Sequence, residues 1–116
     1  VHEMSGVNQS DIQSLMIYDN FTPTVIFTLE GFGYAPQGEG GAFVENGRLE
    51  LGGALPTNTN GGHLSESYMQ GWSLNVEAVR QVRGELQARQ VPNAHHVQYL
   101  QGGPLSTSII YGSEPV

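Results

Sequence analysis

Cysteine and lysine are both absent from this sequence of 116 residues, and arginine occurs only four times. Without cysteine the chain has no disulfide framework, no thiolate nucleophile and no thiolate metal ligand. This composition is compatible with a reducing cytoplasm, where we expect the protein to act. Eleven acidic residues against four arginines give a formal net charge of -7. Because phosphate binding depends on clustered lysine and arginine, this balance argues against nucleic acid and anionic membranes as partners.

Long hydrophobic runs are also missing. No stretch approaches 18 apolar residues, and no charged-then-apolar leader opens the sequence, so neither a membrane span nor a signal peptide is expected. The chain begins with Val1, and its first residues, VHEMSGVNQSDIQ, resemble the tail of a helix followed by a loop. We therefore expect a fragment of a longer chain or a processed subunit, with enough residues for one small domain.

Strand-like and helix-like segments alternate in the manner of an α/β fold. Residues 14–19, SLMIYD, form a short apolar run that predicts a buried strand. Residues 21–31 have helical spacing, with Asn20 or Thr22 as cap and Pro23 in the first turn, where no amide hydrogen is needed. The runs HHVQYL and TSIIYG, separated by the turn QGGPL, predict an antiparallel pair of strands. Helices covering a sheet are the expected result.

A second helix is predicted from Ser65 or Ser67, the candidate caps, to about Arg89. Its apolar residues are spaced by three or four and predict the buried face: Trp72, Val76, Val79, Val82 and Leu86. Glu77, Arg80 and Arg83 fall on other faces. Before this helix, residues 33–62 predict a long irregular connection with at most two short strands, at 42–44 and 48–50, turned by ENG. A loop of this length in a compact domain is usually functional.

Several familiar kinds of site are not supported. His95 and His96 are adjacent, so on a strand they point to opposite faces and do not share a metal. The segment GEGG lacks the Lys-Ser/Thr ending of a phosphate-binding P-loop. A Ser65-His63-Asp19 triad has no G-x-S-x-G elbow around its serine. Structural or solvent roles are favoured for the histidines taken alone, and structural roles are expected for Tyr34, Tyr99 and Tyr111.

Two tyrosines occupy positions where chemistry is common. Tyr18 ends the first predicted strand, and ligands in open α/β sheets bind beyond such strand ends. Tyr68 stands at the predicted start of the long helix, after NTNGGHLSES, where amide groups and the helix dipole favour negative charge. Either tyrosine taken alone is also compatible with an amphipathic core position.

Three strings carry a resemblance over almost the whole chain: DIQSLMIYDNF, GEGGAFVENGRLELGGALPTNTNGGHLSESYMQG and the later QGG. They are similar to the C-terminal half of the thiolase superfamily, nearest to its sterol-carrier, lipid-transfer-protein-like branch. The resemblance implies a layered helix/sheet/helix fold, with residues 1–116 forming a partial thiolase-like C-terminal domain. It also implies that the N-terminal half, with the nucleophilic cysteine of true thiolases and the dimer contacts, and the opening strand of this half lie outside the chain.

Three thiolase signatures are altered in this sequence. The strand-end motif H-D-x-F or N-E-x-F reads Tyr18-Asp19-Asn20-Phe21, so tyrosine replaces the polar catalytic residue. The motif G-H-P-x-G reads Ser67-Tyr68-Met69-Gln70-Gly71, which puts Tyr68 at the histidine position. The motif C-x-G-G reads Leu100-Gln101-Gly102-Gly103, so leucine replaces the acid/base cysteine. Claisen condensation and thiolysis need that thiol and imidazole.

The same pattern resembles the thiolase-like aldolases of steroid side-chain degradation. This resemblance implies retro-aldol cleavage of a β-hydroxyacyl-CoA to a ketone and a shorter acyl-CoA such as propionyl-CoA, with no cofactor. It implies Tyr18 and Tyr68 as catalytic pair and a partner with an OB-type domain of the DUF35 class. Asp19 and His63 are expected to support proton transfer, and Gly102 and Gly103 to support the site. The helix position favours Tyr68 as the base.

Two alternatives stay open at this point. A non-catalytic thiolase homologue, acting as a lipid-transfer or scaffold subunit that binds acyl-CoA or a partner, explains the altered signatures equally well. An active thiolase that uses a cysteine from the missing half is disfavoured because Leu100 cannot transfer a proton. The acyl group is not defined by the residues.

Overall fold

The computed structural model describes residues 1–114. Its helices and strands are α1 (His2–Ser5), β1 (Ser14–Ile17), α2 (Thr22–Gly31), α3 (Gly40–Phe43), α4 (Trp72–Val82), β2 (His96–Gln101) and β3 (Thr107–Gly112), with single 3-10 turns at Gln9–Asp11 and Gln87–Arg89. The predicted order of strand, helix, loop, helix and two strands is confirmed. Within the described part of the chain, no helix is long and apolar enough to cross a membrane.

The sheet has three strands in the order β1-β2-β3. β1 runs parallel to β2, with Ile17 opposite Leu100. β2 runs antiparallel to β3, with Gln101 opposite Thr107, so the predicted closing pair of strands is confirmed. All four residues of β1 are buried, as expected for a strand that is covered on both faces.

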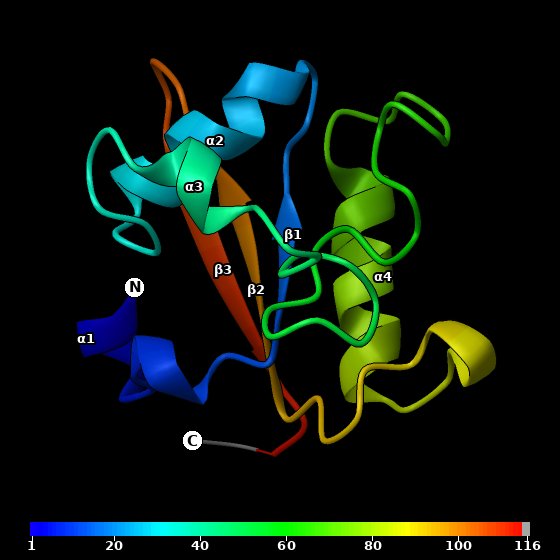
Figure 1. The fold of residues 1–116 in the computed structure, drawn as a ribbon. Coiled ribbons are helices and arrows are strands. Elements are labelled where there is room, and N and C mark those ends of the chain that lie inside the picture. Colours follow the sequence, from blue (N-terminus) through cyan, green and yellow to red (C-terminus); the bar gives the residue numbers. More distant parts are fainter. Residues whose placement is uncertain (115–116) are drawn as a thin grey trace.

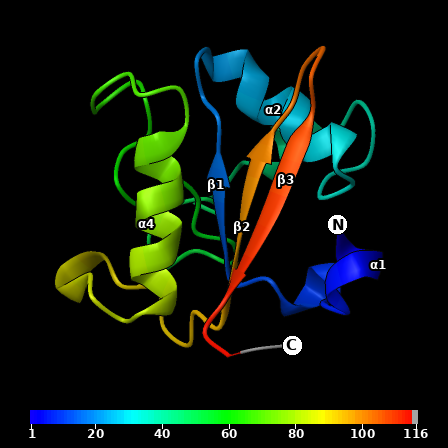
Figure 2. The same ribbon diagram turned by 180° about the vertical axis from the view of Figure 1, so that it is seen from behind.

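Each face of the sheet has its own hydrophobic cluster, because side chains alternate along a strand. Leu15, Ile17 and Leu100 lie in one cluster, together with Leu29 of α2. Met16, Val97 and Tyr99 lie in the other, together with Leu74 and Ala78 of α4. Figure 1 shows α2 and α4 on opposite sides of the sheet, and Figure 2 shows α1 on the β3 side, away from α4. The layered helix/sheet/helix arrangement is confirmed.

The long helix differs from its prediction in length and in orientation. It runs only from Trp72 to Val82, it is capped by Gly71 in the left-handed conformation, and it is followed by turns. The prediction of a start at Ser65 or Ser67 is wrong, because both residues lie in the preceding loop. The predicted buried face is wrong at its start, although Val82 packs against the core and Leu86 is buried. Trp72 is 69% exposed and Val76 54% exposed. The face toward the sheet is instead formed by Leu74, Glu77, Ala78 and Gln81.

The predicted strands at 42–44 and 48–50 do not form. Residues Gly40–Phe43 make the short helix α3, and turns follow it. The Glu30 carboxylate on α2 accepts the Gly40 N–H at 2.9 Å, and a side chain at Gly40 would collide with Ile26. These contacts tie the segment to α2 and leave no partner strand for it. The ENG turn does contain left-handed residues, at Asn46 and Gly47.

The end of this loop lies along the free edge of β1. The Leu15 N–H donates to the Pro56 carbonyl at 3.0 Å, and the Asn58 N–H donates to the Leu15 carbonyl at 2.9 Å. The Asn58 side chain continues the pairing, because its amide bonds the N–H and the carbonyl of Ile17 at 2.7 and 2.9 Å. At the end of β1, the Asn58 side chain thus takes the place of a neighbouring strand and pairs with the backbone N–H and carbonyl of Ile17. The segment that follows, residues 59–63, is thereby held beside Tyr18.

Candidate active site

The two tyrosines singled out from the sequence meet in the structure. Their hydroxyl oxygens lie 3.0 Å apart and share a hydrogen bond. Tyr18 directly follows β1 and still pairs with β2, since its N–H donates to the Leu100 carbonyl at 2.8 Å. Tyr68 lies in the loop before α4 and is 64% exposed. The prediction that Tyr68 begins the helix is wrong: the helix starts four residues later, so its dipole does not act directly on this phenol.

His63 lies against both phenol rings. Its ring centroid is 4.7 Å from that of Tyr18, in an edge-on arrangement, and 5.3 Å from that of Tyr68. Its Nε2 accepts the Gly71 N–H at 3.0 Å. Since an N–H can only donate to a lone pair, Nε2 carries no proton and the neutral ring is protonated at Nδ1. Among residues 1–114 the buried Nδ1 has no hydrogen-bond partner.

Asp19 fixes the backbone beneath the histidine. Its buried carboxylate accepts the His63 N–H at 2.8 Å. Gly62 lies so close to this carboxylate that a Cβ there would overlap it. Asp19 therefore bonds the main chain of His63 and not its imidazole. The Ser65-His63-Asp19 triad does not form, and the geometry gives both Asp19 and His63 a positioning role.

Gly71 closes the loop that carries Tyr68. Its φ angle is 91°, in the region that favours glycine, and a Cβ at this position would overlap the hydroxyl of Tyr99. The Asn75 side chain donates to the Gly71 carbonyl at 2.7 Å, and Tyr111 donates to Asn75 at 2.8 Å. The turn is thus held from both its N–H and its carbonyl. Tyr99 and Tyr111 serve this framework, in agreement with the structural role expected for them.

The shared hydrogen bond acts on the pKa of Tyr18. It is the largest influence that raises the pKa of Tyr18 to about 12, and burial of the ring adds to it. An ordinary phenol has a pKa of about 10. Tyr18 therefore keeps its proton at neutral pH and can serve as a hydrogen-bond donor. The arrangement provides a firmly held phenol beside a second, more exposed one.

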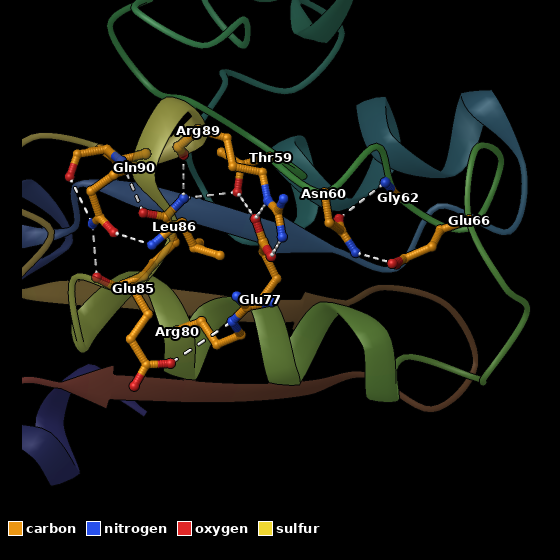
Figure 3. Close-up of polar contacts among 12 residues, drawn as sticks. Thr59, Asn60, Gly62, Glu66, Glu77, Arg80, Glu85, Leu86, Arg89 and Gln90 are labelled. Atoms are coloured by element: carbon orange, nitrogen blue, oxygen red, sulfur yellow. Dashed lines mark hydrogen bonds and ion pairs between the residues drawn. The ribbon is translucent and has the colours of Figure 1, made fainter.

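A polar network anchors the segment that leads into the site, and Figure 3 shows its centre. The buried carboxylate of Glu77 accepts the Thr59 hydroxyl at 2.8 Å and pairs with Arg89 at 2.8 Å. Gln81 donates to Thr59 at 2.9 Å and accepts the Val91 N–H at 2.9 Å. Sequence reasoning missed Glu77 and Gln81, because polar residues within an apolar periodic pattern are normally exposed.

The next two side-chain contacts extend the anchoring toward Tyr68. Asn60 accepts the Gly62 N–H at 3.0 Å and donates to Glu66 at 2.7 Å (Figure 3). Each residue of the run TNTN, residues 57–60, therefore contacts a different part of the fold, from the edge of β1 to the loop that carries Tyr68. This role was not assigned from the sequence, and the repetition of hydroxyl and amide residues is the signal from which it could have been predicted.

The third altered signature lies at the end of β2. Leu100, at the position of the thiolase cysteine, is fully buried in the core cluster that faces α2. Gly102 and Gly103 follow it, and together with Tyr18 they line an open groove of about 600 Å³. The structure thus brings these two glycines and the tyrosine to one side of the molecule.

No group of three or more histidine or acidic side chains suited to a metal occurs among the described residues.

Comparison with known proteins gives a consistent result. Residues 1–111 match the family described as thiolase C-terminal domain-like. The steroid side-chain-cleaving aldolase of Thermomonospora curvata is 48% identical over 84 residues, which cover 72% of this chain and 22% of that protein. The 17-hydroxy-3-oxo-4-pregnene-20-carboxyl-CoA lyase of Mycobacterium tuberculosis is 39% identical over 104 residues, 90% of this chain and 27% of the relative.

More distant relatives and one solved structure complete the picture. Human sterol carrier protein 2 is 33% identical over 96 residues, 80% of this chain and 18% of that protein. The solved structure of an Ltp2-ChsH2(DUF35) aldolase superposes with a TM-score of 0.87 and 40% sequence identity, covering 97% of this chain and 30% of that one. This chain spans about a quarter of the length of the two lyase-type relatives. It belongs to the thiolase C-terminal domain-like family.

Proposed function

We propose that the protein to which this domain belongs is a carbon-carbon lyase that cleaves a β-hydroxyacyl-CoA by a retro-aldol reaction. The observation that carries the proposal is the pair of tyrosine hydroxyls 3.0 Å apart, in a site whose thiol position is a buried leucine. The names of two relatives, a steroid side-chain-cleaving aldolase and a 20-carboxyl-CoA lyase, support the same reaction class. They favour a steroid side-chain CoA ester as substrate.

In this proposal Tyr68 acts as its phenolate, which accepts the hydrogen bond of Tyr18 and takes the proton of the β-hydroxyl group. The resulting alkoxide becomes the carbonyl of the released ketone as the bond between the α and β carbons breaks. The bonding electrons move into the thioester and form its enolate, whose α carbon then recovers a proton from Tyr68. The products are a ketone and a shorter acyl-CoA, propionyl-CoA for a side chain of the type that the lyase's name describes. Neither a cofactor nor a covalent intermediate is needed.

Tyr18 supports this step as a hydrogen-bond donor. Because the pKa of Tyr18 is raised to about 12, its phenol stays protonated while negative charge develops on neighbouring oxygens. A donor already in place stabilises such charge without reorganisation. Asp19 and His63 hold the main chain around the pair, and Gly102 and Gly103 let the backbone come close to the substrate. The roles of the two tyrosines therefore differ.

The experiment that tests the reaction class is product analysis with the full-length protein, purified with any chain that accompanies it. We expect one ketone and one shorter acyl-CoA for each substrate consumed, at a rate independent of added free CoA. Mass spectrometry of the protein during turnover should detect no acyl adduct. A requirement for free CoA, or a covalent acyl-enzyme, would overturn the proposal in favour of an active thiolase.

A second candidate function is a non-catalytic lipid-transfer or scaffold subunit. The similarity to sterol carrier protein 2 and the burial of Leu100 favour it. Acyl-CoA binding with no turnover by the intact protein would support this alternative.

The similarity to the Ltp2-ChsH2(DUF35) aldolase also supports a DUF35 partner for the proposed lyase. We further propose that the full-length protein forms a homodimer through the remainder of its chain and acts in the cytoplasm.

A further inference from the structure

The groove beside Tyr18 lies between α2 and the turn that joins β2 to β3. Figures 1 and 2 show these two segments side by side at one end of the sheet. The residues that line the groove include Tyr18, Phe27, Thr28, Gly102 and Leu105. Its volume of about 600 Å³ falls within the range of about 300–1,000 Å³ that is common for ligand pockets.

The wall of the groove is uncharged and mainly apolar, with Asn20, Gln101 and Ser106 among its polar residues. None of its lining residues is acidic, basic or a histidine. Two large apolar side chains stand open on it, with Phe27 69% exposed and Leu105 79% exposed. The phosphates and ribose of CoA would find no charged partner here, whereas a hydrocarbon skeleton would be removed from water. Of the two parts of an acyl-CoA, the groove therefore fits the acyl carbon skeleton.

One polar group is buried at the wall. Thr28 is 1% exposed, and its hydroxyl has no hydrogen-bond partner within residues 1–114. A Cβ on Gly102 would lie 2.5 Å from this hydroxyl, so the glycine lets the end of β2 approach α2 closely. An unpaired buried hydroxyl is unfavourable. The hydroxyl is shielded from solvent, so an oxygen on a bound ligand, or a water that bridges to it, would provide the missing partner once the Thr28 side chain turns toward the groove.

We propose that this groove binds the fused-ring part of the acyl group, which becomes the ketone on cleavage. The inference rests on the proposed lyase function, because Tyr18 is one of the residues that line the groove and would face the reacting carbon. Phe27 and Leu105 flank the ring system, and the Thr28 hydroxyl donates a hydrogen bond to an oxygen on it. The groove then determines specificity for bulky acyl groups, whereas the tyrosine pair performs the chemistry on any β-hydroxyacyl-CoA.

The test compares two substrates in the full-length protein with its co-purifying chains. One is 17-hydroxy-3-oxo-4-pregnene-20-carboxyl-CoA and the other is 3-hydroxy-3-methylbutanoyl-CoA, which has no rings. Leu105→Ser and Phe27→Ser should each lower kcat/KM for the steroid ester about tenfold, because apolar contact is lost. They should change the short substrate less than about twofold. Leu51→Ser, at another exposed leucine outside the groove, is the matched control and should leave both unchanged.

Equal losses on both substrates, or no loss on either, would overturn the assignment of the groove. A binding measurement separates this outcome from failure of the lyase function, because it needs no turnover. Androst-4-ene-3,17-dione, a ketone with the same rings, should bind the wild type about tenfold more tightly than Leu105→Ser. If Leu105→Ser bound the dione as tightly as the wild type, the proposal would be contradicted even if cleavage is confirmed. If the variant bound the dione more weakly, the proposal would be supported even if cleavage fails.

Thr28→Val tests the hydroxyl, since valine keeps the size of threonine and removes its oxygen. We expect dione binding to weaken about three- to tenfold, in proportion to one lost hydrogen bond. A matched ring compound without oxygens, androstane, should bind both proteins equally. Equal binding of the dione to both proteins would exclude a role for this hydroxyl.

Discussion

At the scale of single residues, the position of Tyr68 depends on glycines and on one imidazole. Gly62 accommodates the Asp19 carboxylate, and Gly71 accommodates the Tyr99 hydroxyl. His63 links the two, since its main chain bonds Asp19 and its ring bonds Gly71. The sequence showed that a tyrosine replaced histidine in this motif, but the hydrogen-bond partners of His63 could not be predicted because they come from separate segments.

Gly71→Ala is expected to displace the loop of Tyr68. The change combines a left-handed backbone with overlap on the Tyr99 hydroxyl, and strain of this kind costs about 1–3 kcal/mol. We expect a loss of stability in urea unfolding and a fall in kcat. Gly84→Ala is the control, because Gly84 has φ 70° but open space around it. If both variants kept full activity, the positioning role of Gly71 would be wrong.

The raised pKa of Tyr18 predicts a particular dependence of stability on pH. Its pKa is about 12 in the folded protein, against 10.0 for the free group. The protonated phenol therefore contributes stability that is fully present below about pH 10 and is lost as the pH rises toward about 12. The unfolding free energy of Tyr18→Phe should fall less steeply over this interval than that of the wild type. The unfolding free energies are measured by denaturant titration at each pH. If they fell equally steeply with pH in both proteins, the pKa of Tyr18 would not be raised by folding.

At the scale of elements, α4 shows what periodicity can and cannot predict. The apolar spacing correctly indicated an amphipathic helix, but the chosen face carries the exposed Trp72 and Val76. The face toward the sheet contains Glu77 and Gln81, whose partners Thr59, Arg89 and Val91 come from other segments. A buried carboxylate is tolerated only when it is paired, and pairing across segments is not encoded in local spacing.

Glu77→Ala is expected to destabilise the fold by about 1–3 kcal/mol, because it removes the buried acceptor of the Thr59 hydroxyl and the partner of the half-exposed Arg89. It should also weaken the anchoring of residues 59–63 and lower activity. Glu85→Ala is the matched control, since Glu85 is 47% exposed and pairs with Arg80 and Arg83 at 3.8 and 3.9 Å. Such exposed pairs contribute about 0–1 kcal/mol. Thermal unfolding of both variants measures the difference. Equal losses of stability in the two variants would refute the anchoring role of Glu77.

The strands and the loop illustrate the same distinction. β1, β2 and β3 were predictable because short apolar runs bounded by turn residues have few alternatives. The segment around ENG was not, since its pattern suits a hairpin while Glu30 and Ile26 on α2 hold Gly40 in a helical turn. Contacts distant in sequence decided this structure. The family resemblance, by contrast, depended on the whole motif and correctly indicated the architecture.

On the scale of the whole molecule, the candidate site is assembled from two segments that are distant in the sequence. The end of β1 supplies Tyr18 and Asp19, and the loop before α4 supplies His63 and Tyr68. The sequence indicated which residues to examine, and the structure places the two hydroxyls in contact. Their catalytic roles stay a prediction. Because Leu100 is buried and carries no acid/base group, the two phenols are the groups that we propose as acid and base among the three altered signatures.

The most direct measurement is the cleavage rate of the steroid β-hydroxyacyl-CoA by the full-length protein and its Tyr18→Phe, Tyr68→Phe and doubly substituted variants. Each single change should lower kcat by about 10²–10⁴-fold, the usual contribution of an acid or base. The double variant should be little worse than the poorer single one, because the pair acts as a unit. Tyr34→Phe, whose hydroxyl bonds Gln98, is the control and should keep its activity. Near-full activity in both single variants would contradict the account.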